Sequence, residues 1–100
     1  MAGGDAVQIA PDVYKVVLED EHMRVLGTRT GPGDSSEMRS HPNMVGYAIS
    51  DCTWTLTGLD GTTILVAIKA GKTVYLDAVD HSGHDVGTIR SHALLIELKK

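Results

Sequence analysis

The segment EMRSHPNM, residues 37–44, gathers side chains that can bind an anion or transfer a proton. Glu37, Arg39 and His41 are spaced two apart, and side chains with that spacing share one face of an extended strand. An arginine guanidinium is a fixed cation that pairs with carboxylates, and an imidazole titrates near neutral pH. The spacing therefore predicts a carboxylate, a cation and an acid–base group side by side.

A second histidine-containing segment, HSGHDVG, follows at residues 81–87. A regular strand would place His81 and His84 on opposite faces, but a β-bulge at Gly83 would turn His84 to the same side as His81. His41, His81 and His84 would then supply three nitrogen ligands and leave one position open, as in catalytic zinc sites. This three-histidine metal site is one hypothesis.

The metal-free hypothesis uses the same residues for acid–base catalysis. Arg39 would hold a carboxylate or enolate, His41 and His81 would exchange protons, and Glu37 would complete the catalytic set. Such a site favours an isomerase, cyclase or lyase acting on a small anionic or carbonyl-containing molecule. In a purely structural interpretation, Arg39 and Glu37 form an ion pair and His41 ends a strand. The residues expected to line a substrate pocket are Met44, Gly46, Tyr47, Trp54 and Tyr75.

Composition excludes several other classes of function. The 100-residue chain has a net charge of −4, and its lysines and arginines are scattered, so no basic stripe is available for nucleic acid. Residues 1–12 lack the features of a signal peptide, and no run approaches the roughly 20 apolar residues of a membrane span. We therefore expect a cytoplasmic protein that binds neither nucleic acid nor membrane. The single cysteine, Cys52, rules out an intrachain disulfide, and we expect it to be buried.

Short strands dominate the elements that would position these residues. In CTWTLT, residues 52–57, Cys52, Trp54 and Leu56 alternate with threonines, which is typical of a half-buried strand. Strong breakers, including GPGD, LDGT, KAGK and HSGHDVG, separate such runs, and Asp60-Gly61 predicts a tight hairpin. The pattern predicts an all-β antiparallel barrel or jelly roll with essentially no helix. We expect residues 1–10 to be a loose segment and residues 11–100 to form a single domain.

Taken in order, these pieces resemble the cupin superfamily, whose members are RmlC-like jelly rolls. GPGDSSEMRSHPNMVGYAIS follows the course of the first cupin motif, and AGKTVYLDAVDHSGHDVG follows that of the second. The resemblance implies a barrel over residues 13–98 and metal ligands at four positions. Here those positions hold Arg39, His41, Met44 and His81. Arginine cannot donate a lone pair and methionine is a soft ligand, so a degenerate metal site is predicted.

Three kinds of function stay open on this basis. We expect a metal-independent acid–base enzyme with no cofactor. The alternatives are a dioxygenase-like cupin enzyme that binds a divalent metal (Zn, Ni, Fe or Mn) and a non-enzymatic cupin that only binds a small molecule. Val45, Tyr47 and Ile49 form an apolar row opposite the expected pocket face, and such a row predicts a homodimer.

Overall fold

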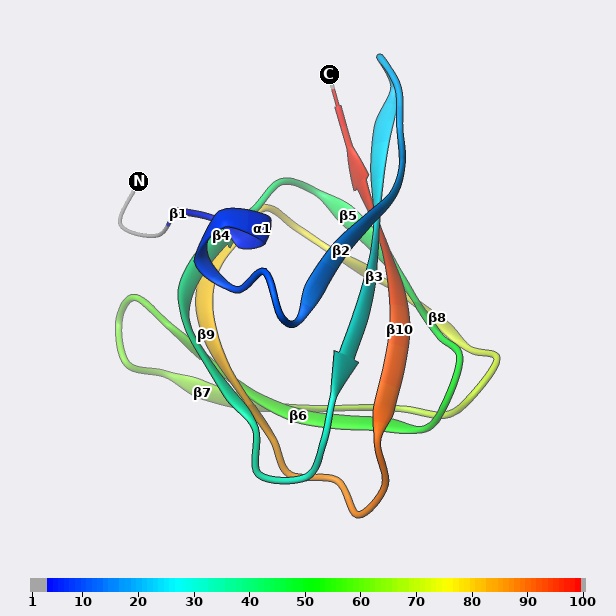
Figure 1. The fold of residues 1–100 in the computed structure, drawn as a ribbon. Helices are drawn as coiled ribbons and strands as arrows, with labels where there is room; N and C mark the ends of the chain where they lie inside the picture. Colours follow the sequence, from blue (N-terminus) through cyan, green and yellow to red (C-terminus); the bar gives the residue numbers. More distant parts are fainter. Residues whose placement is uncertain (1–3, 100) are drawn as a thin grey trace.

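A computed structural model describes residues 4–99 as two sheets that face each other and curve into a barrel (Figure 1). One five-stranded sheet has the order β1-β4-β9-β6-β7, and the other has the order β2-β3-β10-β5-β8. All strand pairs are antiparallel except β1 with β4. The all-β jelly roll predicted from the sequence is confirmed. The elements are β1 (Gly4–Asp5), α1 (Ala6–Ile9), β2 (Tyr14–Glu19), β3 (Met23–Thr30), β4 (Ser35–His41), β5 (Met44–Ala48), β6 (Cys52–Gly58), β7 (Thr63–Ile68), β8 (Thr73–Leu76), β9 (Val79–Asp85) and β10 (Ser91–Leu98).

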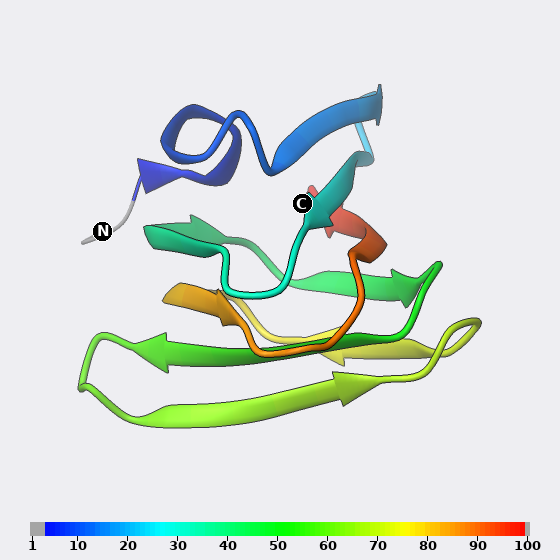
Figure 2. The ribbon, with the colours of Figure 1, turned by 60° about the horizontal axis from the view of Figure 1, so that its bottom comes forward.

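Alternation along the strands separates an inner from an outer face of each sheet. In β10, Ser91, Ala93, Leu95 and Glu97 are buried, whereas the residues between them are half-buried or exposed. In β5, Met44, Gly46 and Ala48 are buried in the same way. The inner faces point toward the opposite sheet; Figure 2 shows the strands of both sheets stacked on one another in this barrel. Val45 is half-buried and Tyr47 and Ile49 are exposed, so the predicted dimer row does lie on the outer side.

Two glycine turns set the ends of the strands as the sequence predicted. Gly61 has φ +83° in the tight turn between β6 and β7, and Gly33 has φ +89° in the GPGD turn before β4. A left-handed backbone of this kind favours glycine, since a Cβ would crowd the residue's own backbone. By contrast, HSGHDVG was expected to break the chain near Gly83 and Gly87. This expectation is wrong at Gly83 and right at Gly87, which follows the end of β9. Strand β9 runs through Gly83 to Asp85 because it pairs with β4 on one side and β6 on the other.

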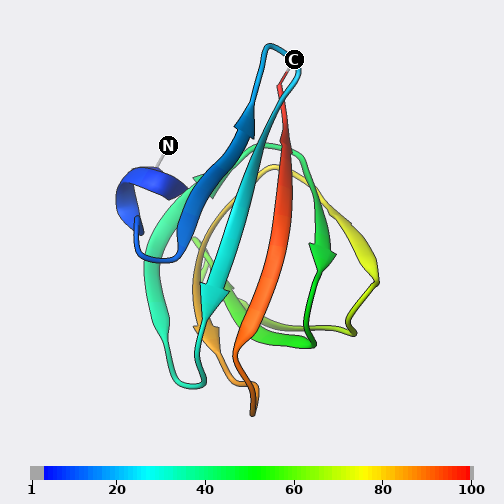
Figure 3. The same ribbon diagram turned by 45° about the vertical axis from the view of Figure 1, so that its right-hand side comes forward.

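The N-terminal segment packs against the barrel over its described part. Asp5 caps the four-residue helix α1 by accepting from the Val7 amide at 3.2 Å, and Ala6 is completely buried in the core with Tyr14 and Met44. Figure 3 shows this segment beside β4, which belongs to the sheet that does not contain β2. The expectation of a loose segment is therefore wrong for residues 4–10, and residues 1–3 lie outside the described chain. No helix within residues 4–99 is long and apolar enough to cross a membrane.

Candidate functional site

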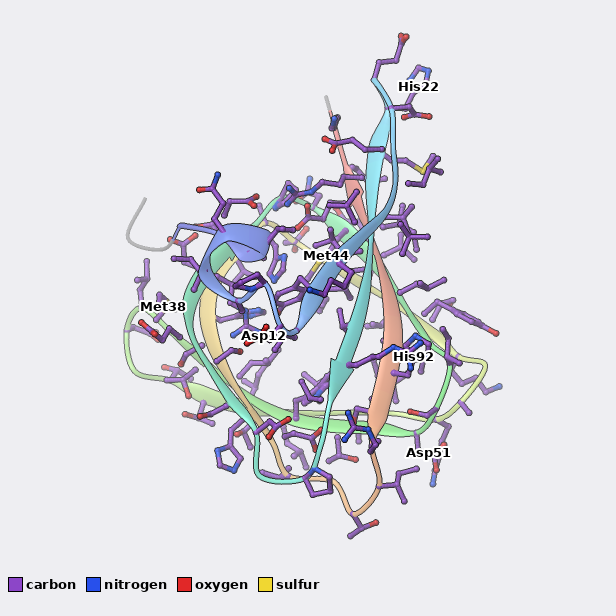
Figure 4. The ribbon with its side chains drawn as sticks, viewed as in Figure 1. Asp12, His22, Met38, Met44, Asp51 and His92 are labelled. Atoms are coloured by element: carbon purple, nitrogen blue, oxygen red, sulfur yellow. The ribbon has the colours of Figure 1, made fainter. Side chains whose placement is uncertain are left out.

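A cavity of about 70 Å³ lies between the two sheets, and strands from both of them line it. Most of its wall is apolar, but four polar side chains meet at one part of the lining: Tyr14, Arg39, His41 and His81. Each of the four is at most 5% exposed. Figure 4 shows Met44 inside the barrel with this cavity, and Met38 and His92 on its outside. These four polar residues therefore form a buried cluster at the cavity.

A bulge in β4 decides which residues of the opening segment reach the cavity. Ser36 pairs with Gly83 and Arg39 pairs with His81, so Glu37 and Met38 together face the single residue Ser82. The extra residue shifts the alternation, and Ser36, Arg39 and His41 line the cavity while Glu37 is exposed. The prediction that Glu37 shares a face with Arg39 and His41 is therefore wrong.

Arg39 lies in the cluster without an acidic partner. Its Nε donates to the Tyr14 hydroxyl at 2.9 Å, and its Nη1 donates to the His81 carbonyl at 3.3 Å. Within residues 4–99, no carboxylate lies within 4 Å of its nitrogen atoms. A buried cation normally has such a partner, because taking it out of water is costly. The remaining N–H groups of Arg39 are thus the strongest anion-binding feature of the cavity.

His41 is held from behind by a chain of charged groups. Its Nδ1 lies 2.8 Å from Glu97 Oε2, while Arg24 binds the other oxygen of Glu97 at 2.6–2.8 Å and also pairs with Asp5 at 2.7 Å. A carboxylate bound in this way only accepts hydrogen bonds, so His41 Nδ1 carries the proton. In the neutral imidazole the lone pair is then on Nε2, and this nitrogen is buried without a hydrogen-bond partner in the described chain. Such a nitrogen can accept a proton.

His81 differs from His41 in having no carboxylate at its ring. Burial, together with repulsion from Arg39 and His41, lowers the pKa of His81 to about 3. The two imidazole rings are 5.3 Å apart between centroids. Burial also raises the pKa of the Tyr14 hydroxyl. At neutral pH the cluster therefore offers a neutral imidazole at His81 and a protonated phenol at Tyr14 beside the cation of Arg39.

The predicted pocket residues reach the cavity in part. Met44, Gly46 and Trp54 line it. Tyr47 borders it but is 38% exposed, and Tyr75, which is 54% exposed, lies outside its lining. Tyr75 pairs with Val45 on the outward-facing row of its sheet, which explains why it points away.

The fold family implies a metal at the four positions Arg39, His41, Met44 and His81, and these four do converge on the cavity. The donor set does not fit one. A guanidinium occupies one position and a thioether another, and residues 4–99 contain no group of three His, Cys, Asp or Glu side chains that could hold a metal. His84 only borders the cavity and is exposed, because β9 pairs with β6 in regular register and has no bulge at Gly83. The bulge expected there lies in β4.

Sequence reasoning missed one residue of the cluster, Tyr14, and the two residues that support His41 from behind, Arg24 and Glu97. Glu97 carried a usable signal, since it is the one charged residue on the face of β10 that otherwise holds Ser91, Ala93 and Leu95. Tyr14 and Arg24 carried no such signal. The residues beside each of them in the sequence include both polar and apolar ones, so neither stands out. Their contacts with β4 and β10 form only when the barrel closes.

Comparison with solved structures identifies the class of fold. A cupin domain from Bordetella pertussis Tohama I superposes with a TM-score of 0.79 at 18% identity and covers 100% of this chain and 99% of that one. An RmlC-like cupin family protein with a double-stranded β-helix fold from Methanocaldococcus jannaschii gives 0.68 at 15%, covering 87% and 79%. An RmlC-like cupin from Shewanella frigidimarina NCIMB 400 gives 0.58 at 12%, covering 87% and 75%.

The chain therefore has the cupin fold, the double-stranded β-helix of RmlC-like proteins. No protein-family model matches the sequence. No curated protein matches it either. At these identities the structural likeness defines the fold alone.

Proposed function

We propose that the barrel cavity binds a small anionic or carbonyl-containing molecule through Arg39 and exchanges a proton with it, without a metal. The observation that carries this proposal is the burial of Arg39 in the cavity wall with no carboxylate within 4 Å in the described chain. A bound carboxylate or enolate would supply the missing countercharge in a site of low dielectric constant. Ligand binding would thus offset the cost of burying the guanidinium.

The histidines support acid–base chemistry of the isomerase, cyclase or lyase type. His41, backed by Glu97 at 2.8 Å, presents Nε2 as the base. A proton taken by Nε2 would be stabilised by the same carboxylate, as in other His–carboxylate pairs. Arg39 and the Tyr14 hydroxyl would stabilise negative charge on the oxygen of an enolate. Glu37, which is exposed, has no part in this mechanism.

The test has a binding arm and a chemical arm. In the binding arm, small carboxylates and 2-oxo acids are titrated into 15N-labelled protein, and shifts of the Arg39 and histidine side-chain signals are followed. Arg39→Leu should abolish these shifts, whereas Arg29→Leu, which removes an exposed arginine of β3, should leave them unchanged. Shifts that persist in Arg39→Leu would contradict the anion site.

In the chemical arm, the same compounds are incubated with the protein in D2O, and loss of the α-proton signal is measured by NMR. Exchange that is catalysed by the wild type and lost in His41→Asn would support an acid–base enzyme. Binding without exchange for any enolisable ligand would contradict catalysis and leave a cupin that only binds a small anion.

A further inference from the structure

The charges around the cavity bear on what kind of anion it takes. Besides Arg39, the fixed charges on the lining belong to the carboxylates Asp34 and Asp85. Both are engaged with their own turns: Asp85 accepts from Thr30 at 2.6 Å and from the Gly87 amide at 2.9 Å, and Asp34 accepts from the Gly31 amide at 2.8 Å. Neither carboxylate is a countercharge for Arg39. A dianion in this cavity would meet one cation and two like charges.

The neutral polar groups cannot make up for the missing second cation. His81 has its pKa lowered to about 3 by burial and by the neighbouring cation of Arg39, so it stays uncharged near neutral pH. Arg24 is a cation close to the cluster, but it is bound to Glu97 and Asp5. A ligand with a single negative charge is therefore the one that Arg39 can neutralise fully.

The free geometry of Arg39 suits a carboxylate. A guanidinium has five N–H groups, and the hydrogen bonds from Nε and Nη1 use two of them. Nη2 and the second N–H of Nη1 remain as a parallel pair of donors, which matches the two oxygens of a carboxylate. The guanidinium lies over Gly83, where a Cβ would be only 3.0 Å from Nη2. Any residue larger than glycine at position 83 would therefore displace this pair of donors, which we call the Arg39 fork.

Away from the cluster, part of the cavity wall is made of aliphatic and aromatic side chains, whereas Thr28, Ser35 and Ser36 lie elsewhere on the lining. Strands β6, β7, β8 and β10 contribute Leu56, Val66, Ile68, Leu76 and Leu95, and Trp54 joins them. Trp54 places its one donor on Thr30 at 3.2 Å, so its ring offers the cavity only an apolar surface. A polar or charged second end of the ligand that packs against this apolar part of the wall would lose its hydration without gaining a partner.

We infer that the ligand is a compact monocarboxylate: its carboxylate lies on the Arg39 fork and its uncharged, apolar body lies against Leu56, Val66 and Ile68. This inference rests on the proposed function and narrows it, because phosphates, dicarboxylates and polyhydroxylated acids are excluded. The cavity volume of about 70 Å³ limits the body to a few carbon atoms or one small ring.

Isothermal titration calorimetry on the full chain at pH 7 and constant ionic strength tests the inference with matched probes. Butyrate and benzoate are the monocarboxylates, butyramide and benzamide their neutral isosteres, succinate the dicarboxylate, and inorganic phosphate the dianion. Butyrate or benzoate should bind one to one and at least about tenfold more tightly than its amide, succinate or phosphate, as expected for a charge-assisted pair. Arg39→Leu should remove that preference, Arg39→Lys should reduce it, and Arg29→Leu should keep it.

The wall is tested by Val66→Thr, which replaces a methyl group of the lining with a hydroxyl at nearly constant size and should weaken benzoate binding severalfold. Tighter binding of succinate or phosphate that still depends on Arg39 would overturn the monocarboxylate inference and leave the proposed anion site standing. Absence of binding for every anion, or binding that Arg39→Leu leaves unchanged, would overturn both. The heat of unfolding of each variant, measured by calorimetry, shows that a lost signal does not come from misfolding.

Discussion

Arg24 and Arg39 reach the same buried cluster from neighbouring elements, but their surroundings are opposite. Arg24 lies between two carboxylates, with Glu97 at 2.6 Å and Asp5 at 2.7 Å. Arg39 is more deeply buried, yet its hydrogen-bond partners are a phenol and a backbone carbonyl. The charge of Arg24 is neutralised within the fold, and that of Arg39 is not. The comparison suggests that Arg24 stabilises the barrel and that Arg39 binds a ligand.

The same contrast separates the two histidines. His41 contacts Glu97, whose charge Arg24 neutralises, and this contact fixes the tautomer of His41. His81 lies beside Arg39 and has no carboxylate at its ring. A proton gained by His41 is therefore shared with a countercharge, whereas a proton gained by His81 adds to an existing excess of positive charge. Only a bound anion would change that balance for His81.

The largest effect that separates the two arginines is on stability. Arg24→Leu leaves the Glu97 carboxylate buried with His41 alone, and breaking a buried pair in this way should cost roughly 3 kcal/mol in the free energy of unfolding. Arg39→Leu removes a cation without a countercharge and places an apolar side chain in an apolar cavity, so stability should change by less than about 1 kcal/mol. Urea titrations of both variants, with Arg29→Leu as control, measure the difference. Equal losses would mean that Arg39 is structural as well.

A smaller effect appears in the pH dependence of stability. The pKa of His81 is lowered to about 3 in the folded protein from 6.5, so between these values the unfolded chain binds the extra proton. Stability should therefore fall as the pH drops below 6.5, by at most about 1.4 kcal/mol per unit from this one group. Asp5, Asp20 and Asp60 have lowered pKa values, so their contributions are lost only below about pH 4.

Urea titrations between pH 4.5 and 6.5 isolate this contribution. The wild type should lose about 2 kcal/mol across that window, and His81→Gln should lose clearly less. A saturating monocarboxylate should also flatten the wild-type profile, because a negative charge beside His81 favours its protonated form. A His81→Gln profile that runs parallel to that of the wild type would show that the ring titrates normally in the folded protein.

The sequence could reveal mainly those features that depend on contacts between residues close together in the chain. The alternation in residues 52–57, which turns Trp54 and Leu56 but not the threonines toward the cavity, and the tight turn at Gly61 are local, and both were predicted correctly. The convergence of Arg39, His41 and His81 followed from strand spacing and the order of the two motifs. The exposure of Glu37 did not, because the bulge in β4 exists only in the pairing with β9, more than 40 residues away along the chain.

The countercharges were beyond sequence reasoning for the same reason. Glu97 reaches His41 across 56 residues, and Arg24 reaches Glu97 across 73. Nothing in a linear pattern says which of two arginines will meet a carboxylate once the sheets close. That assignment separates a structural cation from a binding one, and it had to come from the folded chain.

The smallest expected effect concerns the space that Gly83 gives to Arg39. A Cβ at this position would lie 3.0 Å from Nη2 and 3.1 Å from Nη1 of Arg39, so the flexible guanidinium must move by a few tenths of an ångström. The backbone of β9 is regular there and tolerates alanine. Gly83→Ala should therefore leave the fold intact and weaken monocarboxylate binding by about two- to fivefold, since the donor fork is displaced.

The control is Gly27→Ala in β3, whose Cβ would meet Val17 at 3.2 Å, away from the cavity lining. It should not change affinity. Calorimetric titration with butyrate or benzoate resolves a change of this size. If Gly83→Ala binds as tightly as the wild type, the fork does not need its observed position, and the contrast between the two arginines would rest on charge alone and not on geometry.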